Sequence, residues 1–309
     1  VIVMSHGLGD TRSSFFDVAS HAASHGFVVA LPEHIGSNSD YRAELFAGLT
    51  QDYFAASDFL DRPLDITFLL DELEQTNASQ YQGQLNLEQV AIAGHSFGGY
   101  TALAVGGATV DFARLTERCD PDANIVLDGA MVMECRALEL LAQPDVVRQL
   151  GDTGVGDERV QLVMAFAPVS NIFGERGISQ IQQPVMILGG AFDILAPVVS
   201  QQLLAFSWLT TPEKYFYLGE NTSHSAEFTT LTSRLFKLDE QFDQSILEAG
   251  LGMSRDLYKG LIVAFGKVYL ENLREYEPFL TAAHIEEASQ EPFNFHLVEE
   301  MPEPLMPMK

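Results

Sequence analysis

The chain has 309 residues, of which 47% are hydrophobic and 19% charged, and its formal net charge at pH 7 is −26. This length and composition are typical of a globular protein with one sizeable core, and no linker, repeat or low-complexity tract marks a domain boundary. The excess of acidic over basic residues, 43 against 17, argues against nucleic acid and anionic membrane surfaces as partners. No apolar run approaches the length of a membrane-spanning helix.

The apolar run from Val1 to Met4 predicts a strand buried on both faces of a parallel sheet. Because the sequence opens in this strand without a methionine or a leader, we expect the natural chain to begin earlier, with N-terminal strands and any signal peptide in the missing part. The loop Ser5-His-Gly-Leu-Gly9 follows, and its glycines would let a backbone N–H turn toward a reacting group. We expect His6 to form structural hydrogen bonds in this loop.

The next segments predict a helix, a strand and a second helix. Residues 11–25 carry apolar side chains at helical spacing and precede Gly26, a suitable C-cap, and residues 27–31 predict a strand. Residues 32–57 show no clear period and are interpreted as an extended connection. Pro63 is interpreted as the start of a helix, because apolar residues follow it at helical spacing.

The stretch Val90-Ala-Ile-Ala-Gly-His-Ser-Phe-Gly-Gly99 combines an apolar run with a serine between glycines. It predicts a short buried strand that leads into Ser96 on a tight turn and then into a helix of small residues. Gly94 and Gly98, two positions before and after the serine, would let the strand and the helix approach closely. We identify Ser96 as a candidate nucleophile, and a buried serine in an ordinary turn is the alternative.

The alternation of strands and helices is interrupted over about residues 111–158, which we interpret as a cap inserted over the site. Methionines in this segment suit an adaptable acyl pocket, although core filling is the alternative. The predicted lining of the pocket is Met131, Met133, Phe173, Ile194 and Leu195.

The two cysteines of the chain, Cys119 and Cys135, both lie in this insertion. They predict a disulfide across the cap, and therefore an oxidising compartment, which favours a periplasmic or secreted protein. Two free buried thiols are the alternative and would allow a cytoplasmic location.

Three further apolar runs, at residues 160–167, 184–190 and 214–218, predict strands. Asp193 follows the second and His224 the third, which completes the chain order Ser, Asp, His of the α/β hydrolases. A serine hydroxyl needs a base within hydrogen-bond reach and a group that orients this base. We therefore predict a triad of Ser96, His224 and Asp193, with the N–H groups of Leu8 and Phe97 as oxyanion donors.

Other residues could fill these roles. Asp128 and Glu220 are the alternative acids. The alternative bases precede the serine turn or lie in helical or loop contexts, and they are His6, His21, His25, His34, His95 and His284. Residues 226–291 predict a helical extension, with apolar residues at helical spacing from Leu257 to Leu273, and the tail after Pro292 is expected to lie over the surface.

Three of these motifs resemble the plasma-type platelet-activating-factor acetylhydrolases, namely the opening Ser-His-Gly-Leu-Gly, residues 23–30 and Gly94-His-Ser-Phe-Gly-Gly99. Most of the chain is similar to the bacterial, often cyanobacterial, predicted dienelactone-hydrolase-like proteins. The similar segments include Arg62-Pro-Leu-Asp-Ile66, the cysteine-containing insertion and Ser289-Gln-Glu-Pro-Phe293. The resemblance implies an α/β-hydrolase fold, in which a mostly parallel sheet is flanked by helices, with a cap insertion and a helical C-terminal extension. It also implies serine esterase activity, with Leu8, Ser96, Phe97, Asp193 and His224 at the motif positions.

Two departures limit what is carried over. The acetylhydrolases place their acid after an earlier strand, where this sequence has Ala167-Pro-Val-Ser-Asn171, and the dienelactone hydrolases use a cysteine where this chain has Ser96. We therefore predict a single-domain carboxylesterase for short- to medium-chain acyl esters, or for aliphatic polyesters if the cap leaves the site open. The alternatives are a phospholipid acetylhydrolase or lipase, an amidase or peptidase, and a non-catalytic binding protein. No cofactor or metal is expected, because the sequence lacks His-Glu-x-x-His and paired Cys-x-x-Cys motifs.

Overall fold

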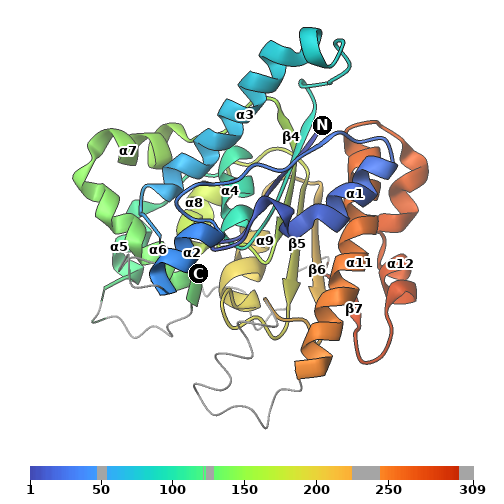
Figure 1. Ribbon diagram of the computed structural model, residues 1–309. Coiled ribbons are helices and arrows are strands. Elements are labelled where there is room, and N and C mark those ends of the chain that lie inside the picture. Colours follow the sequence, from blue (N-terminus) through green and yellow to red (C-terminus); the bar gives the residue numbers. More distant parts are fainter. Residues whose placement is uncertain (47–53, 121, 123–128, 225–243, 299–309) are drawn as a thin grey trace.

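The computed structural model describes residues 1–46, 54–120, 122, 129–224 and 244–298. Its centre is a seven-stranded sheet in the order β2-β1-β3-β4-β5-β6-β7 (Figure 1). The first six strands run parallel and β7 pairs antiparallel with β6. This arrangement confirms the predicted mostly parallel sheet. The strands are β1 (Ile2–Ser5), β2 (Val29–Ala30), β3 (Val90–His95), β4 (Val160–Phe166), β5 (Val185–Gly190), β6 (Lys214–Gly219) and β7 (Phe295–Val298).

Helices cover both faces of the sheet (Figure 1). The longer ones are α1 (Phe16–Ser24), α2 (Ser39–Phe46), α3 (Asp58–Gln80), α4 (Phe97–Val105), α5 (Phe112–Arg118), α6 (Gly129–Arg136), α11 (Gln244–Tyr269) and α12 (Ala282–Ala288). The shorter α-helices and the 3₁₀- and π-helical segments are η1 (Arg12–Phe15), η2 (Ala137–Ala142), α7 (Pro144–Arg148), η3 (Gln149–Thr153), η4 (Asn171–Phe173), α8 (Gly174–Ile178), η5 (Val198–Leu203), α9 (Leu204–Trp208) and η6 (Arg274–Leu280).

Side chains of the central strands alternate between two apolar clusters, as the pleat of a strand requires. Val3, Ile92 and Val163 pack on the face covered by α3, α4 and α9. Their neighbours Met4 and Met164 pack on the opposite face, against α1, α11, η6 and α12. Both faces are therefore buried, which explains the continuous apolar runs of these strands.

Pro63 lies inside α3, six positions along the helix, and not at its start as predicted. A proline has no N–H to donate to the carbonyl four residues earlier, which here is that of Phe59. The hydroxyl of Tyr100 in α4 donates to this carbonyl at 2.8 Å. The side chain of a neighbouring helix thus supplies the missing hydrogen bond, and it ties α3 to the helix that follows Ser96.

Three other expectations are corrected. The segment 32–57, predicted as an extended connection, contains α2, where the side chain of Asn38 accepts the N–H of Tyr41 as an N-cap. The strand predicted over residues 27–31 shrinks to the two residues of β2. The tail after Pro292, expected to lie over the surface, contributes β7, which covers the open edge of β6.

Candidate active site

Ser96 lies between the last residue of β3 and the first of α4, in the backbone conformation φ 57°, ψ −117°. Positive φ is uncommon outside glycine, and the turn is held by the N–H of Ser96, which donates to the carbonyl of Phe166 at 2.9 Å. A Cβ at Gly94 would lie 2.1 Å from the carbonyl oxygen of Gly98, and one at Gly98 would lie 2.1 Å from that of Ser5. The two glycines therefore permit the close approach that lifts Ser96 out of the sheet.

His224 and Asp193 meet in the loops that follow two neighbouring strands, β6 and β5. Nδ1 of His224 lies 2.7 Å from Oδ2 of Asp193, and both side chains are buried. The other carboxylate oxygen of Asp193 accepts the N–H groups of Leu195 at 3.0 Å and Ala196 at 2.8 Å. These two bonds fix the rotation of the carboxylate, which leaves Oδ2 for the imidazole.

His95 links this pair to the serine turn. Its ring centroid lies 4.6 Å from that of His224. A Cβ at Gly7 would lie 3.3 Å from Nδ1 of His95 and 3.5 Å from Cβ of Ser96. The structure thus brings the loop after β1, the serine turn and His224 into one place. Burial keeps the pKa of His95 well below its ordinary value, so this ring is neutral.

The predicted oxyanion donors belong to the same cluster of loops. Phe97 is the first residue of α4, so its N–H has no acceptor within the helix. Within the described part of the chain, neither this N–H nor that of Leu8 donates to a protein acceptor. Two backbone donors beside a serine hydroxyl are the chemical requirement for holding a tetrahedral oxyanion.

The alternative acids and bases have other surroundings. Glu220 hydrogen-bonds the side chains of Asn294 and His296 at the β6–β7 edge, and Asp128 lies outside the described residues. The alternative bases lie on or directly after α1, on α12, beside Ser96 or in the loops after β1 and β2: His21, His25, His284, His95, His6 and His34.

The residues predicted to line the acyl pocket occupy different environments. Phe173 is fully buried and stacks on Tyr100 with ring centroids 5.0 Å apart. Met131 is also buried, whereas Met133, Ile194 and Leu195 are partly exposed. The carbonyl of Leu195 accepts the N–H of Ala130, so the start of α6 touches the loop that carries Asp193. Contact of these five residues with a substrate stays a prediction.

Cys119 and Cys135 form a disulfide, with Cα atoms 5.7 Å apart. It connects the end of α5 to α6, so it lies within the predicted cap. The neighbouring Glu134 is fully buried and was missed by the sequence analysis. Its Oε1 accepts the N–H of Ile172 at 2.8 Å and its Oε2 accepts Nη1 of Arg118 at 2.6 Å.

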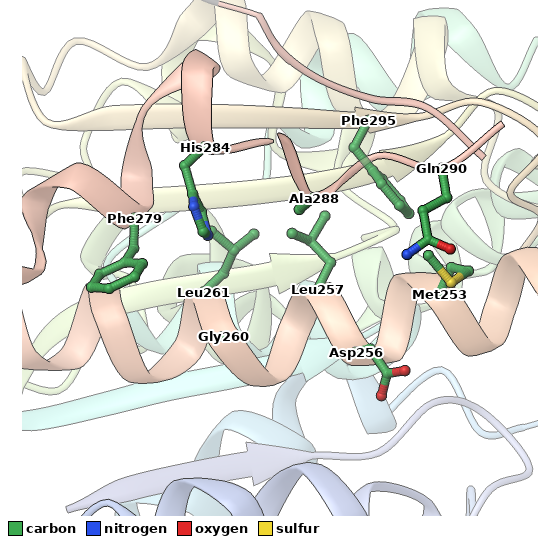
Figure 2. A pocket seen from close by; sticks show the side chains of 10 residues that line it. All are labelled: Met253, Asp256, Leu257, Gly260, Leu261, Phe279, His284, Ala288, Gln290 and Phe295. Carbon is green, nitrogen blue, oxygen red and sulfur yellow. The ribbon is translucent and has the colours of Figure 1, made fainter. Parts of the chain in front are cut away.

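A cavity of about 320 Å³ lies apart from these residues, between α11 and the segment from η6 to β7 (Figure 2). Figure 2 shows Leu257 and Leu261 of α11 facing Ala288 and His284 of α12 across it. None of its lining residues belongs to the predicted site.

Two further properties concern the described residues only. No three His, Cys, Asp or Glu side chains among them gather into a group that could hold a metal ion. None of the described helices is both long and apolar enough to cross a membrane.

Comparison with protein families identifies a match that covers most of the chain. The profile described as the alpha/beta hydrolase family matches residues 2–254, which include β1, the serine turn, Asp193 and His224. No curated protein matches the chain.

Proposed function

The chain belongs to the alpha/beta hydrolase family, and from this premise we propose that it is a serine carboxylesterase that hydrolyses short- to medium-chain acyl esters. Ser96 is the nucleophile, His224 the general base and Asp193 the acid that orients it. The N–H groups of Leu8 and Phe97 hold the oxyanion. This family consists in general of hydrolases, and the ester specificity is our inference.

In the first half of the reaction, Oγ of Ser96 attacks the ester carbonyl carbon while Nε2 of His224 takes the hydroxyl proton. The negative charge moves to the former carbonyl oxygen and is stabilised by the two backbone N–H groups. The tetrahedral intermediate then collapses, the alcohol leaves with the proton from His224, and an acyl ester on Ser96 remains. In the second half, water attacks this ester by the same route and releases the acid.

The hydrogen bond between His224 and Asp193 is the single observation that carries the proposal. Because a carboxylate only accepts, the 2.7 Å contact puts the proton on Nδ1, so Nε2 of the neutral ring carries a lone pair. This is the tautomer that a general base needs. A binding protein would have no need of a buried imidazole that a carboxylate orients.

Hydrolysis of p-nitrophenyl esters tests the proposal. We expect turnover of acetate, butyrate and octanoate esters, and at least a hundredfold lower kcat/KM for a matched anilide, because the leaving group of an amide is much poorer. Equal rates for ester and anilide would favour an amidase. An emulsified aliphatic polyester, assayed beside the soluble esters, tests the polymeric substrates, and phosphatidylcholine tests the phospholipase alternative.

We also propose that residues 111–158 are a cap over this site within a single domain. Support comes from α5, α6, η2, α7 and η3, which interrupt the alternation between α4 and β4, and from the contact of Ala130 with Leu195 near Asp193. The disulfide in this segment supports an oxidising compartment, and hence a periplasmic or secreted location.

A further inference from the structure

Arg62 of α3 is buried with 1% of its surface exposed and reaches the loop that carries Leu8. Its Nη1 donates to the carbonyl of His6 at 2.8 Å and its Nη2 to the carbonyl of Gly7 at 3.3 Å. Its Nε donates to Oγ of Ser37 at 2.8 Å. The guanidinium therefore holds two consecutive carbonyls that immediately precede the predicted oxyanion donor.

The carbonyl of Gly7 accepts two further hydrogen bonds, one of them from the N–H of Asp10 at 3.3 Å. Nδ1 of His6 lies 2.8 Å from this oxygen, and Nε2 of the same ring accepts the N–H of His34 at 3.0 Å. Since a carbonyl only accepts and an N–H only donates, the tautomer of His6 is fixed with its proton on Nδ1. Burial, and secondarily the charge of Arg62, lower the pKa of His6 to about 3, so the ring keeps this neutral tautomer.

The carbonyl of Gly7 and the N–H of Leu8 belong to one peptide unit. In a trans peptide these two groups point in opposite directions. The donors from Arg62, His6 and Asp10 fix the carbonyl, so they also fix the direction of the Leu8 N–H, away from Arg62. Gly7 also lies beside Ser96, since a Cβ built on it would be 3.5 Å from Cβ of the serine.

The same guanidinium contacts the residue of the second donor. Its Cζ lies 4.5 Å from the centroid of the Phe97 ring, which is fully buried. Arg62 thus contacts the peptide unit that carries the Leu8 N–H and also the ring of Phe97.

The charge of Arg62 has no direct counter-ion among the described residues, because no carboxylate there lies within 4.0 Å of the guanidinium. Asp58, Asp65 and other carboxylates act on it only from farther away. A buried charge bound to neutral acceptors is expensive to maintain. The charge is therefore maintained at a cost, and it lies beside the peptide that carries the Leu8 N–H.

We propose that Arg62 is a positioning residue for the oxyanion hole. It orients the Gly7–Leu8 peptide toward Ser96, and its charge polarises this peptide so that the N–H of Leu8 is a stronger donor to the developing oxyanion. The inference rests on the proposed function, because it presupposes an oxyanion formed at Ser96.

The test compares Arg62→Met, Arg62→Lys and a matched control, Arg159→Met. Arg159 also contacts α3, through Asp71 and Glu74, but at a distance from the site. We measure kcat and KM for p-nitrophenyl butyrate, per site titrated with a fluorophosphonate, and the inhibition constant of a trifluoromethyl ketone, which forms a tetrahedral adduct on the serine.

Arg62→Met is expected to lower kcat by about 10² to 10³, as loss of an oxyanion donor does, with KM changed less than threefold. The inhibition constant of the ketone rises by a similar factor. Arg62→Lys, which restores the charge and one donor, recovers part of kcat and keeps the assay informative if the methionine variant fails to fold. Arg159→Met lowers the melting temperature but leaves kcat per site unchanged.

Two results would overturn the inference: a kcat per site for folded Arg62 variants within threefold of the wild type, or a loss of kcat without a matching change for the ketone. Failure of the proposed function has a different signature. In that case the wild type hydrolyses no ester, or Ser96→Ala hydrolyses it as well as the wild type does.

Discussion

Nδ1 of His224 donates a hydrogen bond of 2.7 Å to Oδ2 of Asp193, while the other oxygen of this carboxylate is held by two backbone N–H groups. The two oxygens therefore have separate tasks. One orients the imidazole and the other shapes the turn after β5. This division decides what an isosteric substitution of Asp193 would do.

In Asp193→Asn, the N–H groups of Leu195 and Ala196 select the amide oxygen, because the amide NH₂ cannot accept them. The NH₂ then faces His224 and donates to Nδ1, which moves the ring proton to Nε2. We expect kcat to fall by on the order of 10⁴ near neutral pH while the turn and the melting temperature are preserved. Steady-state kinetics with circular dichroism checks both parts.

Glu220→Gln is the matched control, since Glu220 is one of the two alternative acids and hydrogen-bonds Asn294 and His296. It should leave kcat unchanged. If Asp193→Asn keeps kcat within tenfold of the wild type while Glu220→Gln loses it, the acid has been assigned to the wrong strand end.

The disulfide between Cys119 and Cys135 closes a short loop, with a sequence separation of 16. Alkylation should add no alkyl group to the unreduced protein and two to the reduced protein, as counted by intact-mass measurement. A loop of this size contributes about 3 kcal/mol in the chain-entropy treatment, so the double Cys→Ser variant should unfold at lower urea. Two alkyl groups on the unreduced protein would mean free thiols and would remove the support for an oxidising compartment.

Glu134→Gln should destabilise the protein by about 3 kcal/mol, because it leaves the Arg118 guanidinium in a largely buried position opposite a neutral amide. Glu139→Gln is the control. Glu139 pairs with Arg136 at the surface, where such a pair contributes at most about 1 kcal/mol. Urea unfolding of the two variants gives the difference, and equal midpoints would contradict the structural role of Glu134.

The sequence predicted those parts of the fold that follow from local pattern. The apolar runs of β3, β4, β5 and β6 and the helical spacing in α11 are explicit in the residues. So is the serine turn, because Gly94 and Gly98 mark a close approach of backbone to backbone. Ser96, Asp193 and His224 each follow a predicted strand. Because the carboxyl ends of parallel strands lie at one edge of a sheet, the three residues could be expected to meet there.

Features that depend on distant partners could not be predicted. Pro63 was predicted at a helix start, where a proline lacks no hydrogen bond. Its place inside α3 depends on the hydroxyl of Tyr100, a distant residue that donates to the carbonyl of Phe59 instead. The strand β7 depends on the free edge of β6, and Glu134 is identified only by contacts with Arg118 and Ile172. The contacts of Arg62 could not be predicted either, because they depend on the loop after β1 and on Ser37.

His6 should make the protein less stable in acid. Its pKa is about 3 in the folded state against 6.5 ordinarily, so between these values the unfolded chain binds a proton that the folded chain does not. Stability contributed by the neutral ring is therefore lost as pH falls from 6.5 toward 3. Burial raises the pKa of Asp58 to about 6, so between pH 3.8 and 6 the folded chain binds a proton on this carboxyl that the unfolded chain does not. The contribution of Asp58 to stability therefore increases as the pH falls through this range.

His6→Asn removes this proton uptake. The stability difference between pH 7.5 and 4.5, measured by urea unfolding, should shrink by on the order of 2 kcal/mol relative to the wild type. The exposed His25→Asn serves as the control and should follow the wild-type curve. Parallel curves for all three proteins would contradict a buried neutral His6.

The central claim is that Ser96 forms the acyl-enzyme, and the kcat of Ser96→Ala for p-nitrophenyl butyrate tests it most directly. Loss of the hydroxyl removes the covalent route and leaves the fold intact, so we expect an unchanged melting temperature, no fluorophosphonate labelling and a rate below a thousandth of the wild type, on the order of the loss for other triad serines. A folded Ser96→Ala protein that keeps more than about a thousandth of the wild-type kcat would contradict the account.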